Sequence, residues 1–353
     1  MSASPAPHLQ HAIRQLAMGA SLSSLEARAA FESVMAGEAS VAQLSALLVA
    51  LRVKGETPEE VAGAASALRG AMVRLRAERP EELVDTCGTG GGAVGTFNIS
   101  TAAALVAAGA GVRIAKHGNR SFTSRCGSAD VLEALGVAIE VPVPVMEASL
   151  RDAGIVFMFA PLMHPAMRHV GPVRRELGIP TVMNIVGPLA NPAGAGRQVV
   201  GVADARRVPL IAGALASLGT IHALVVHGEP GMDEISPLGT TQVVEIRSGH
   251  EPREWTIDPD RYGLATGDAG ELTGGSPREN AAAILAVLDG SAPPTAIAVV
   301  LLNAAAAIHV SSTASGEFGD ALEIARAALD DGRAFAALER LRTASGRAGA
   351  HSP

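Results

Sequence analysis

A glycine-rich segment between a predicted strand and a predicted helix constrains this chain more than any other feature. Five glycines fall within the eight residues from Gly88 to Gly95, and no apolar periodicity accounts for them. Glycine lets backbone N–H groups approach an oxygen-rich ligand closely and adopts positive φ without strain. The start of the next helix, Asn98-Ile99-Ser100-Thr101, adds free N–H groups and the positive end of its dipole. The segment therefore predicts an anion-binding loop after the strand Val84–Cys87.

A second polar loop follows the next predicted strand, Val112–Ala115. It runs from Lys116 to Ser121, and Lys116 and Arg120 bring two fixed positive charges to it. Carboxyl ends of parallel strands meet at one edge of a sheet, where ligands bind. We expect the two loops to meet there, so that one site can hold more than one phosphate.

Two common phosphate motifs do not describe the first loop. A P-loop needs Gly-Lys-Ser/Thr at its end, whereas Gly95 is followed by Thr96. Gly88-x-Gly90-x-x-Ala93 satisfies the loose dinucleotide pattern, but that pattern also wants an acidic residue after the next strand. This strand ends in Lys116-His117 instead, so the sequence does not favour NAD binding.

Short apolar runs alternate with helical patterns from Val84 onward, which predicts an α/β fold with a central, mainly parallel sheet covered on both faces. The expected strands are Val84–Cys87, Val112–Ala115, Ala138–Val141, Ile155–Phe159, Thr181–Val182, Val199–Val202, Ala223–Val226 and Thr241–Ile246. A polar stretch then runs to Gly275, and helices are expected from Ser276, over Thr295–Val310, and twice between Gly316 and Gly346.

The first part of the chain predicts a small all-α domain. Capping boxes open three helices at Ser23, Ser40 and Thr57, and a further helix is expected near His8–Met18. Their apolar stripes are broader than four short helices need, which predicts packing against a second subunit. We expect the small helical domain to span residues 1–78 and the large α/β domain residues 79–350, joined by a hinge-associated helical segment near 165–195.

Charge and composition exclude several classes of protein. The 353 residues carry a net charge of −7 without a basic block, and only 3% are aromatic, which argues against nucleic-acid binding. The sequence contains no run of 18 apolar residues, so no membrane span is predicted. The N-terminus lacks the positive charge and the apolar core that are typical of a signal peptide. Two cysteines make no disulfide framework. We expect a reduced, soluble, cytoplasmic protein.

Three groups of polar residues are candidates for chemistry. Asp233-Glu234 follows a predicted strand; the pair fits either an exposed acidic turn or a Mg²⁺ site, in which adjacent carboxylates that point apart could serve two ions. His117 lies between the charged residues of the second loop, where a catalytic role competes with a structural one. Further basic residues, Arg168, His169, Arg174 and Arg175, fit a solvated helix face.

Several long motifs resemble the anthranilate phosphoribosyltransferase family. They are Gly88-Thr89-Gly90-Gly91, Thr96-Phe97-Asn98-Ile99-Ser100-Thr101, Lys116-His117-Gly118-Asn119-Arg120-Ser121 and the segment from Gly127 to Gly136, and the resemblance continues to about Asn303-Ala304-Ala305-Ala306. It implies a nucleoside phosphorylase-like phosphoribosyltransferase architecture and a homodimer. It also implies transfer of a phosphoribosyl group from phosphoribosyl pyrophosphate (PRPP) to anthranilate with Mg²⁺, the second step of tryptophan biosynthesis from chorismate.

The same resemblance implies roles for individual residues. For PRPP these are Gly88, Gly91, Gly92, Thr96, Asn98, Ile99, Ser100, Thr101, Lys116, His117, Gly118, Asn119, Arg120, Ser121, Phe122, Thr123, Ser124 and Ser128. For anthranilate they are Gly88, Asn119, His164 and Arg174, and for metal Ser100, Asp233 and Glu234. A planar guanidinium such as that of Arg174 suits the anthranilate carboxylate. No residue is implied as a dedicated acid or base, although His117 and Asn119 lie near the acceptor.

The chain departs from the family pattern at Gly92, where most members carry an aspartate; this leaves open how metal and pyrophosphate are held beside the loop. Two alternatives to the transferase also remain. A related nucleoside phosphorylase shares the architecture but needs a nucleobase pocket rather than a carboxylate site. A non-catalytic nucleic-acid-binding paralogue conflicts with the net charge of −7 and with Asp233-Glu234.

Overall fold

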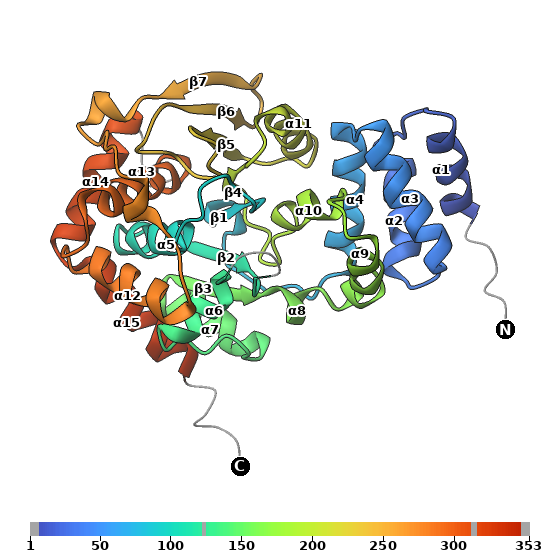
Figure 1. The fold of residues 1–353 in the computed structure, drawn as a ribbon. Coiled ribbons are helices and arrows are strands. Elements are labelled where there is room, and N and C mark those ends of the chain that lie inside the picture. Colours follow the sequence, from blue (N-terminus) through green and yellow to red (C-terminus); the bar gives the residue numbers. More distant parts are fainter. Residues whose placement is uncertain (1–6, 122–124, 312–315, 347–353) are drawn as a thin grey trace, which may run out of the picture.

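A seven-stranded sheet forms the frame of the larger part of this computed structural model, which describes residues 7–121, 125–311 and 316–346 (Figure 1). The strand order is β3-β2-β1-β4-β5-β6-β7. Strands β1 to β5 pair in parallel, and β6 and β7 complete one edge in antiparallel pairing. The strands are β1 Val84–Gly88, β2 Ile114–Gly118, β3 Ile155–Phe159, β4 Arg197–Gly201, β5 His222–Gly228, β6 Thr241–Arg247 and β7 Arg253–Ile257.

Buried side chains alternate between the two faces of the sheet, as the pleat requires. On β4 and β5, Val199 and Leu224 face one apolar core, while Val200 and Ala223 face another. The first core is shared with α5 Ile99–Gly109, α6 Ser128–Ala134, α12 Pro277–Leu288, α13 Pro294–Val310, α14 Phe318–Asp330 and α15 Arg333–Gly346. The second core lies beneath α11 Val208–Ser217, and α7 Val143–Ala153 packs along β3.

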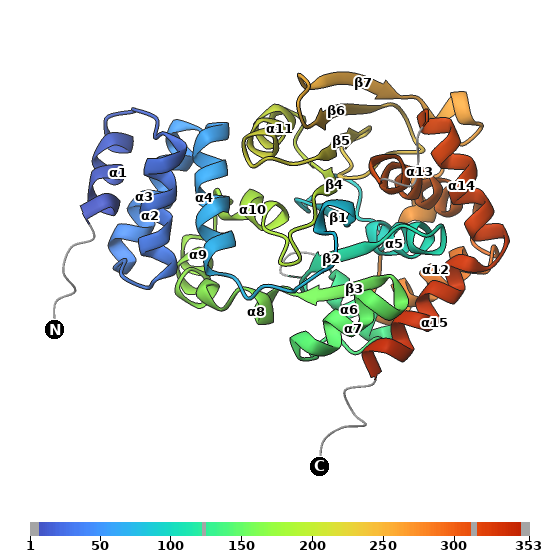
Figure 2. The ribbon, with the colours of Figure 1, turned by 180° about the vertical axis from the view of Figure 1, so that it is seen from behind.

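A smaller helical body precedes the sheet and lies beside it (Figures 1 and 2). It contains α1 Pro7–Ala17, α2 Ser24–Met35, α3 Val41–Lys54 and α4 Pro58–Ala71. Three short helices of the later chain, α8 Ala160–Met163, α9 Gly171–Leu177 and α10 Met183–Val186, lie between the two bodies. The expected fold class is confirmed. In the described part of the chain, no helix is both long and apolar enough to cross a membrane.

The expected capping boxes at Ser23, Ser40 and Thr57 are present, with side-chain and backbone groups bonded reciprocally in each. Two expected strands are wrong. Ala138–Val141 pairs with no strand; Ile139 and Val141 are buried, and the Ala138 amide donates to Ser345 Oγ over 3.1 Å. Thr181–Val182 leads into α10, and the Thr181 amide donates to Asn184 Oδ1 over 3.0 Å.

Strand β7 was missed because it is an edge strand with mostly exposed side chains, so Arg253–Ile257 has no apolar alternation to reveal it. The remaining expected strands coincide with observed ones to within three residues at each end. Apolar alternation therefore predicts an extended, half-buried backbone, whether or not a neighbouring strand supplies the hydrogen bonds.

Glu60 ties the helical body together from a fully buried position. Its carboxylate accepts from the Leu22 amide over 2.9 Å, from the Thr57 amide over 2.9 Å and from Lys54 Nζ over 3.0 Å. One side chain thus caps α4, fixes the turn before α2 and neutralises a half-buried lysine. Removing it leaves a buried amide and an ammonium group unpaired.

We predict that Glu60→Ala lowers the free energy of unfolding by about 3 kcal/mol, the scale for breaking a buried ion pair. Urea unfolding followed by circular dichroism measures it. Glu59→Ala is the control, because Glu59 is exposed in the same helical turn, and it should change stability by about 0.5 kcal/mol or less. Equal stability of the two variants would show that Glu60 is not a buried anchor.

Candidate active site

Three joined cavities lie at the carboxyl edge of the sheet, where β1, β2 and the segment after β5 meet. The loop cavity, of about 450 Å³, is lined by the glycine-rich loop, the start of α5, and Asp233 and Glu234. The central cavity, of about 230 Å³, shares both acids with it. The outer cavity, of about 470 Å³, shares His117 and Asn119 with the central one. The loop cavity, with its carboxylates and backbone amides, is therefore linked by shared lining residues, through the central cavity, to the largely apolar outer cavity.

The glycine-rich loop turns sharply beside Asp233. Gly90 and Gly91 have φ of 69° and 83°, in the left-handed region that non-glycine residues rarely adopt. The Gly90 amide donates to Asp233 Oδ2 over 2.8 Å, and the Ala93 amide donates to the Gly231 carbonyl over 2.8 Å. These bonds join the loop after β1 to the loop after β5, so the two polar segments form one wall.

The N-terminus of α5 closes the loop cavity, with Thr96 to Ser100 in its lining. The Asn98 side chain does not cap this helix. Its amide donates to the Cys126 carbonyl over 3.3 Å, and its oxygen accepts from Asn280 Nδ2 over 2.9 Å. Because the Asn98 side chain makes no capping hydrogen bond, the positive end of α5 can face an anion in the cavity.

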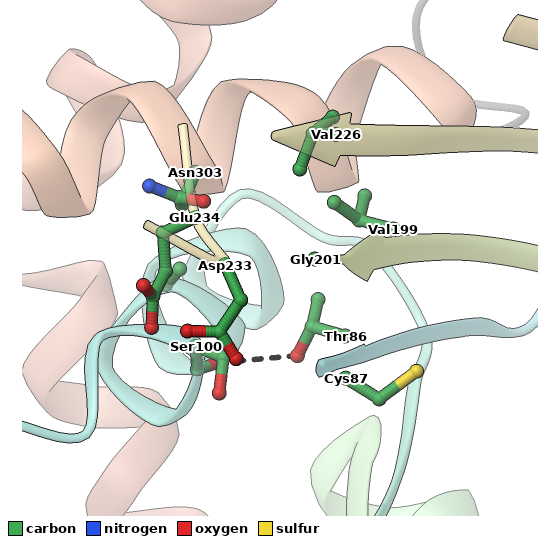
Figure 3. A pocket seen from close by; sticks show the side chains of 10 residues that line it. Thr86, Cys87, Ser100, Val199, Gly201, Val226, Asp233, Glu234 and Asn303 are labelled. Carbon is green, nitrogen blue, oxygen red and sulfur yellow. Dashed lines mark hydrogen bonds between the residues drawn. The ribbon is translucent and has the colours of Figure 1, made fainter. Parts of the chain in front are cut away.

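Asp233 and Glu234 turn toward the same region above Ser100 (Figure 3). Both are half-buried, so the interpretation as an exposed acidic turn is wrong. Burial raises the pKa of both carboxyl groups, and contact with Asp233 raises the pKa of Glu234 further. Glu234 Oε2 has no hydrogen-bond partner among the described residues.

These features fit a divalent cation. A cavity of about 20 Å³, enough for one water-sized particle, is lined by Thr86, Ser100 and the two acids (Figure 3). Mg²⁺ prefers one or two carboxylates, with water and phosphate oxygens completing its shell. Its charge would also relieve the repulsion between two desolvated carboxylates, so Asp233, Glu234 and Ser100 are suited to hold it.

Lys116 reaches the central cavity from β2 and is almost entirely buried. Its ammonium group donates to the Thr86 carbonyl, and to Ser100 Oγ over 3.2 Å. Burial lowers the pKa of Lys116, while the nearby Asp85 carboxylate opposes that shift. Burial also disfavours the charged form of Asp85 and raises the pKa of its carboxyl group to about 6. The central cavity therefore contains a lysine that is oriented through hydrogen bonds before any ligand arrives.

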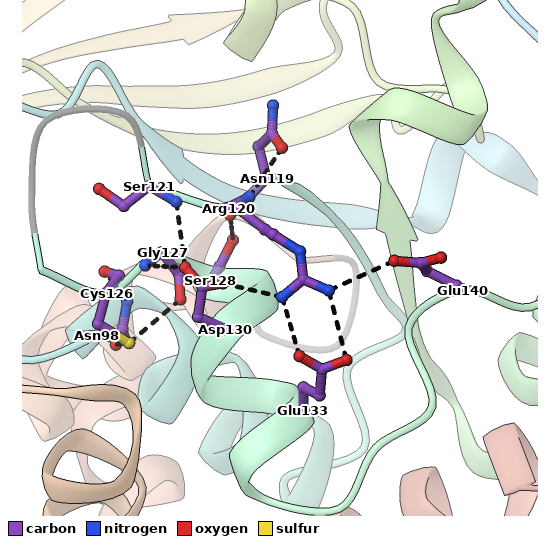
Figure 4. A network of polar contacts seen from close by, with 10 residues as sticks. All are labelled: Asn98, Asn119, Arg120, Ser121, Cys126, Gly127, Ser128, Asp130, Glu133 and Glu140. Atoms are coloured by element: carbon purple, nitrogen blue, oxygen red, sulfur yellow. Dashed lines mark hydrogen bonds and ion pairs between the residues drawn. The ribbon is translucent and has the colours of Figure 1, made fainter.

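Arg120 does not face these cavities. Its guanidinium pairs with Asp130 over 3.0 Å, Glu133 over 2.9 Å and Glu140 over 3.4 Å (Figure 4). Asp130 also accepts from the Ser121 and Gly127 amides, over 3.2 and 2.8 Å. The expected second fixed charge is thus engaged in holding the loop between β2 and α6. Sequence spacing could not reveal these competing carboxylates.

The outer cavity combines two neutral imidazoles with one arginine. The ring centroids of His117 and His164 lie 4.9 Å apart. Burial lowers the pKa of His117 to about 3 and that of His164 to about 4, so both are uncharged at neutral pH. Arg174 is half-buried, and no described carboxylate pairs with it. The chamber suits a flat aromatic ligand with a carboxylate.

Most of the predicted site residues line the three cavities: Gly88, Gly91, Gly92, Thr96, Asn98, Ile99, Ser100, Lys116, His117, Gly118, Asn119, Ser128, His164, Arg174, Asp233 and Glu234. Thr101, Arg120 and Ser121 are not part of those linings. The predicted Phe122, Thr123 and Ser124 lie outside the described residues.

Four buried polar residues around the site escaped sequence reasoning: Asp85, Asn191, Asn280 and Asn303. Asn303 bonds both backbone groups of Ile235, next to Glu234, at 3.0 and 2.9 Å. Asn280 holds Asn98. Asp85, Asn191 and Asn303 interrupt apolar segments, and this signal was available because a buried polar group needs a partner; Asn280 follows Arg278 and Glu279 and gave no such signal.

Comparison with known proteins extends over nearly the whole chain. The helical bundle domain of the glycosyl transferase family matches residues 10–72, and the a/b domain of that family matches residues 80–335. An anthranilate phosphoribosyltransferase from Roseiflexus sp. is 49% identical over 333 residues, covering 94% of this chain and 97% of that protein.

Two solved structures share the fold. The crystal structure of anthranilate phosphoribosyltransferase from Thermus thermophilus has a TM-score of 0.89 and 42% identity, covering 95% of this chain and 99% of that one. The enzyme from Saccharomyces cerevisiae, in complex with PRPP and Mg, has a TM-score of 0.87 and 28% identity, covering 98% and 99%.

We predict that the unfolding free energy of the metal-free protein falls as pH rises through the raised carboxyl pKa values of Asp233 and Glu234. Because folding raises these pKa values, the folded protein holds protons that the unfolded chain has already lost. This stabilisation is complete below the unfolded pKa and disappears as pH rises through the folded pKa. Asp233→Asn with Glu234→Gln should remove this component. Chemical unfolding in EDTA at pH 5 and pH 8 measures it.

At pH 8, Mg²⁺ at one hundred times its dissociation constant should stabilise the parent by about 2.7 kcal/mol and the double variant hardly at all. Glu254→Gln, at an exposed position on β7, is the control and should behave as the parent. A double variant that still gains stability from Mg²⁺ would place the ion elsewhere.

Proposed function

The chain belongs to the anthranilate phosphoribosyltransferase family, and we propose that its three joined cavities transfer the 5-phosphoribosyl group of PRPP to the amine of anthranilate. The products are N-(5-phosphoribosyl)anthranilate and pyrophosphate, in the second step of tryptophan biosynthesis from chorismate. The observation that carries this proposal is the set of shared lining residues, because His117 and Asn119 belong both to the central cavity beside the anion-binding loop and to an outer chamber suited to an aromatic acid.

PRPP occupies the loop and central cavities in this proposal. Backbone amides of the glycine-rich loop and the start of α5 face its phosphates, and Lys116 adds a positive charge. Mg²⁺ bound by Asp233, Glu234 and Ser100 would neutralise pyrophosphate charge as the bond to ribose C1 breaks. The remaining members of the PRPP set follow from the family resemblance, with Arg120 acting through the loop that its ion pairs hold.

Anthranilate occupies the outer cavity, with its carboxylate at Arg174 and its ring against His117 and His164. Its arylamine is already neutral at pH 7, so no strong base is needed. The low pKa values of both histidines agree with this, since neutral imidazoles give a ring-binding wall without adding charge. Catalysis then rests on alignment of the amine with ribose C1 and on electrostatic stabilisation of the leaving group.

A direct assay tests the reaction. The fluorescence of anthranilate should fall when PRPP and Mg²⁺ are both present and remain constant when either is left out. A nucleoside phosphorylase would instead cleave nucleosides with phosphate and leave anthranilate untouched. A non-catalytic paralogue would do neither and would bind nucleic acid. The unpaired Arg174 favours the transferase over both alternatives.

We also propose a cytoplasmic homodimer that associates through the helical body, with the small domain ending near residue 78 and the segment 165–195 acting as its hinge to the large domain. Large apolar side chains are exposed on or beside the first three helices. They are Met18, Leu25, Val41 and Val53, with exposed fractions of 76%, 77%, 60% and 82%. Four large, strongly exposed apolar side chains in this body support an interaction surface there.

The assembly prediction is that light scattering at micromolar concentration gives the mass of a dimer and that Val53→Asp shifts it toward the monomer, because a buried unpaired charge disfavours association. Phe335→Asp, on α15 in the other body, makes the same chemical change at a partly exposed position and should leave the dimer intact. A monomeric parent would remove the proposal.

The acceptor prediction concerns Arg174. Arg174→Ala should raise the Michaelis constant for anthranilate by roughly ten- to a hundredfold, corresponding to the 1.5–3 kcal/mol of a charged hydrogen bond. The constant for PRPP should change far less. Arg151→Ala removes an exposed arginine on α7 that lines none of the three cavities and serves as the control. Equal increases in both constants would make Arg174 a structural residue.

The metal prediction concerns Gly92, whose φ lies outside the left-handed region, so that a side chain is compatible with its backbone. A Cβ atom there would lie 3.0 Å from Asp233 Oδ1. Gly92→Asp should therefore lower the Mg²⁺ concentration for half-maximal rate and introduce inhibition at high Mg²⁺, because extra ground-state binding does not raise kcat.

Gly95→Asp is the matched control for this change. It places the same carboxylate on the same loop, where a Cβ atom meets open space rather than Asp233. Thermal melts of both variants separate strain from the metal effect. A Gly92→Asp enzyme with parental stability and an unchanged Mg²⁺ titration would show that position 92 does not face the ion.

A further inference from the structure

A buried cluster of two histidines and one glutamate lies away from the active site. His222 begins β5, Glu245 lies on β6, and His309 lies in the last turn of α13. Their exposed fractions are 6%, 3% and 7%. The reaction leaves all three unused, because the three cavities lie at the opposite, carboxyl end of β5. Buried ionisable groups outside an active site call for a separate explanation.

The ligand atoms of this cluster have the spacing of a metal site. His222 Nε2 lies 2.8 Å and His309 Nε2 3.6 Å from Glu245 Oε1, and one ligand atom from each residue lies within 4.8 Å of the other two. In a tetrahedral zinc site with bonds of about 2.0–2.1 Å, neighbouring ligand atoms are separated by about 3.3 Å. Small side-chain adjustments would therefore suffice for coordination.

His309 supplies an independent observation. Both of its ring nitrogens are buried, and neither has a hydrogen-bond partner among the described residues. Apart from the 3.6 Å approach of Nε2 to Glu245 Oε1, which is longer than a hydrogen bond, no described group replaces the water that this ring loses on burial, and that loss is costly unless something else binds the ring. Its Nε2 is directed toward Glu245, the position in which a cation would complete its bonding.

We propose that His222, Glu245 and His309 bind one divalent transition-metal ion, most simply Zn²⁺. Two imidazoles and a carboxylate suit zinc, whereas Mg²⁺ prefers oxygen ligands, so this ion does not compete for Asp233 and Glu234. Water fills the fourth position. Three protein ligands from β5, β6 and α13 would then be joined at one point.

The surroundings of Glu245 agree with this assignment. Arg247 Nε donates to Oε1 over 2.7 Å, and Arg253 donates to Oε2 over 2.9 Å. Hydrogen bonds of this kind orient metal-ligating carboxylates. The two arginine side chains are 50% and 67% exposed, so both can turn toward solvent when an ion balances the charge of Glu245.

The site would act on the fold rather than on the reaction directly. Six residues before His309, α13 carries Asn303, which bonds both backbone groups of Ile235 beside Glu234. An ion that fixes the end of α13 to β5 and β6 therefore stabilises the helix that also holds the magnesium loop. We expect a rise in melting temperature without a change in the Mg²⁺ dependence of the rate.

Trp255, the only tryptophan of the chain, is a natural reporter. Its ring centroid lies 6.2 Å from that of His309. The experiment uses tag-free, EDTA-treated full-length protein in saturating Mg²⁺, titrated separately with Zn²⁺ for the melting temperature and with Ni²⁺ for quenching of tryptophan fluorescence. We expect one ion per chain, a higher melting temperature and saturable quenching, all unaffected by PRPP.

His309→Asn should weaken both responses by at least about tenfold, the lower scale for disturbing even an outer partner of a metal ligand. His250→Asn is the matched control, since His250 is exposed in the turn between β6 and β7 and its loss should change neither response. Absence of binding, an undiminished response in His309→Asn, or displacement of the ion by PRPP would each overturn the proposal.

Should His309→Asn fold poorly, electron paramagnetic resonance of the Cu²⁺-loaded parent decides the question without a variant. Coupling to two imidazole nitrogens is expected. Coupling to one or none would overturn the assignment, because only His222 and His309 bring imidazoles to Glu245 among the described residues.

Discussion

The buried contact between Asp85 and Asn191 is the constraint on which the active-site edge depends. Asn191 Nδ2 donates to Asp85 Oδ2 over 2.7 Å and to the Ala115 carbonyl over 2.8 Å, while the His117 amide donates to Asp85 Oδ1 over 3.2 Å. One carboxylate on β1 thereby fixes β2 and the chain that follows α10. The phosphate-binding edge and the walls of the acceptor chamber are held to a common point.

The buried Asp85 carboxylate positions the active-site edge but lowers the stability of the fold at neutral pH. Burial raises the pKa of Asp85 to about 6, so the carboxylate is harder to ionise in the folded protein than in the unfolded chain. Between the two pKa values the folded state holds the proton more tightly, and stability from this group falls as pH rises through about 6. At neutral pH the charged form is retained at a cost, and Lys116 and Asn191 offset part of it. The Asp85 carboxylate favours the charged form of Lys116, which burial disfavours, and a phosphate site requires a charged lysine.

Local signals allowed much of the fold and site to be predicted. Capping boxes at Ser40 and Thr57 depend on residues three apart, so the sequence contains the whole interaction. The glycine-rich loop is equally local, because left-handed φ at Gly90 and Gly91 limits which residues fit. Predictions failed where partners are distant in sequence. Arg120 resembles a free cation until α6 and Glu140 bring three carboxylates to it, and Ala138–Val141 resembles a strand until Ser345 takes its backbone hydrogen bond.

Burial of ionisable groups has opposite consequences in the different cavities of the active site. Its loop and central cavities gather helix-terminal amides, Lys116 and two half-buried carboxylates, a set that is balanced only when an anion and a cation arrive together. In the outer cavity, burial lowers the pKa of His117 and His164 and keeps both neutral, whereas burial raises the pKa of Asp233 and Glu234. Desolvation therefore has two effects: it favours a cation beside the carboxylates of one chamber, and it keeps the imidazoles of the adjoining chamber uncharged. His117 and Asn119 line both the central and the outer cavity, so in the proposed function ribose C1 and the acceptor nitrogen would meet beside them.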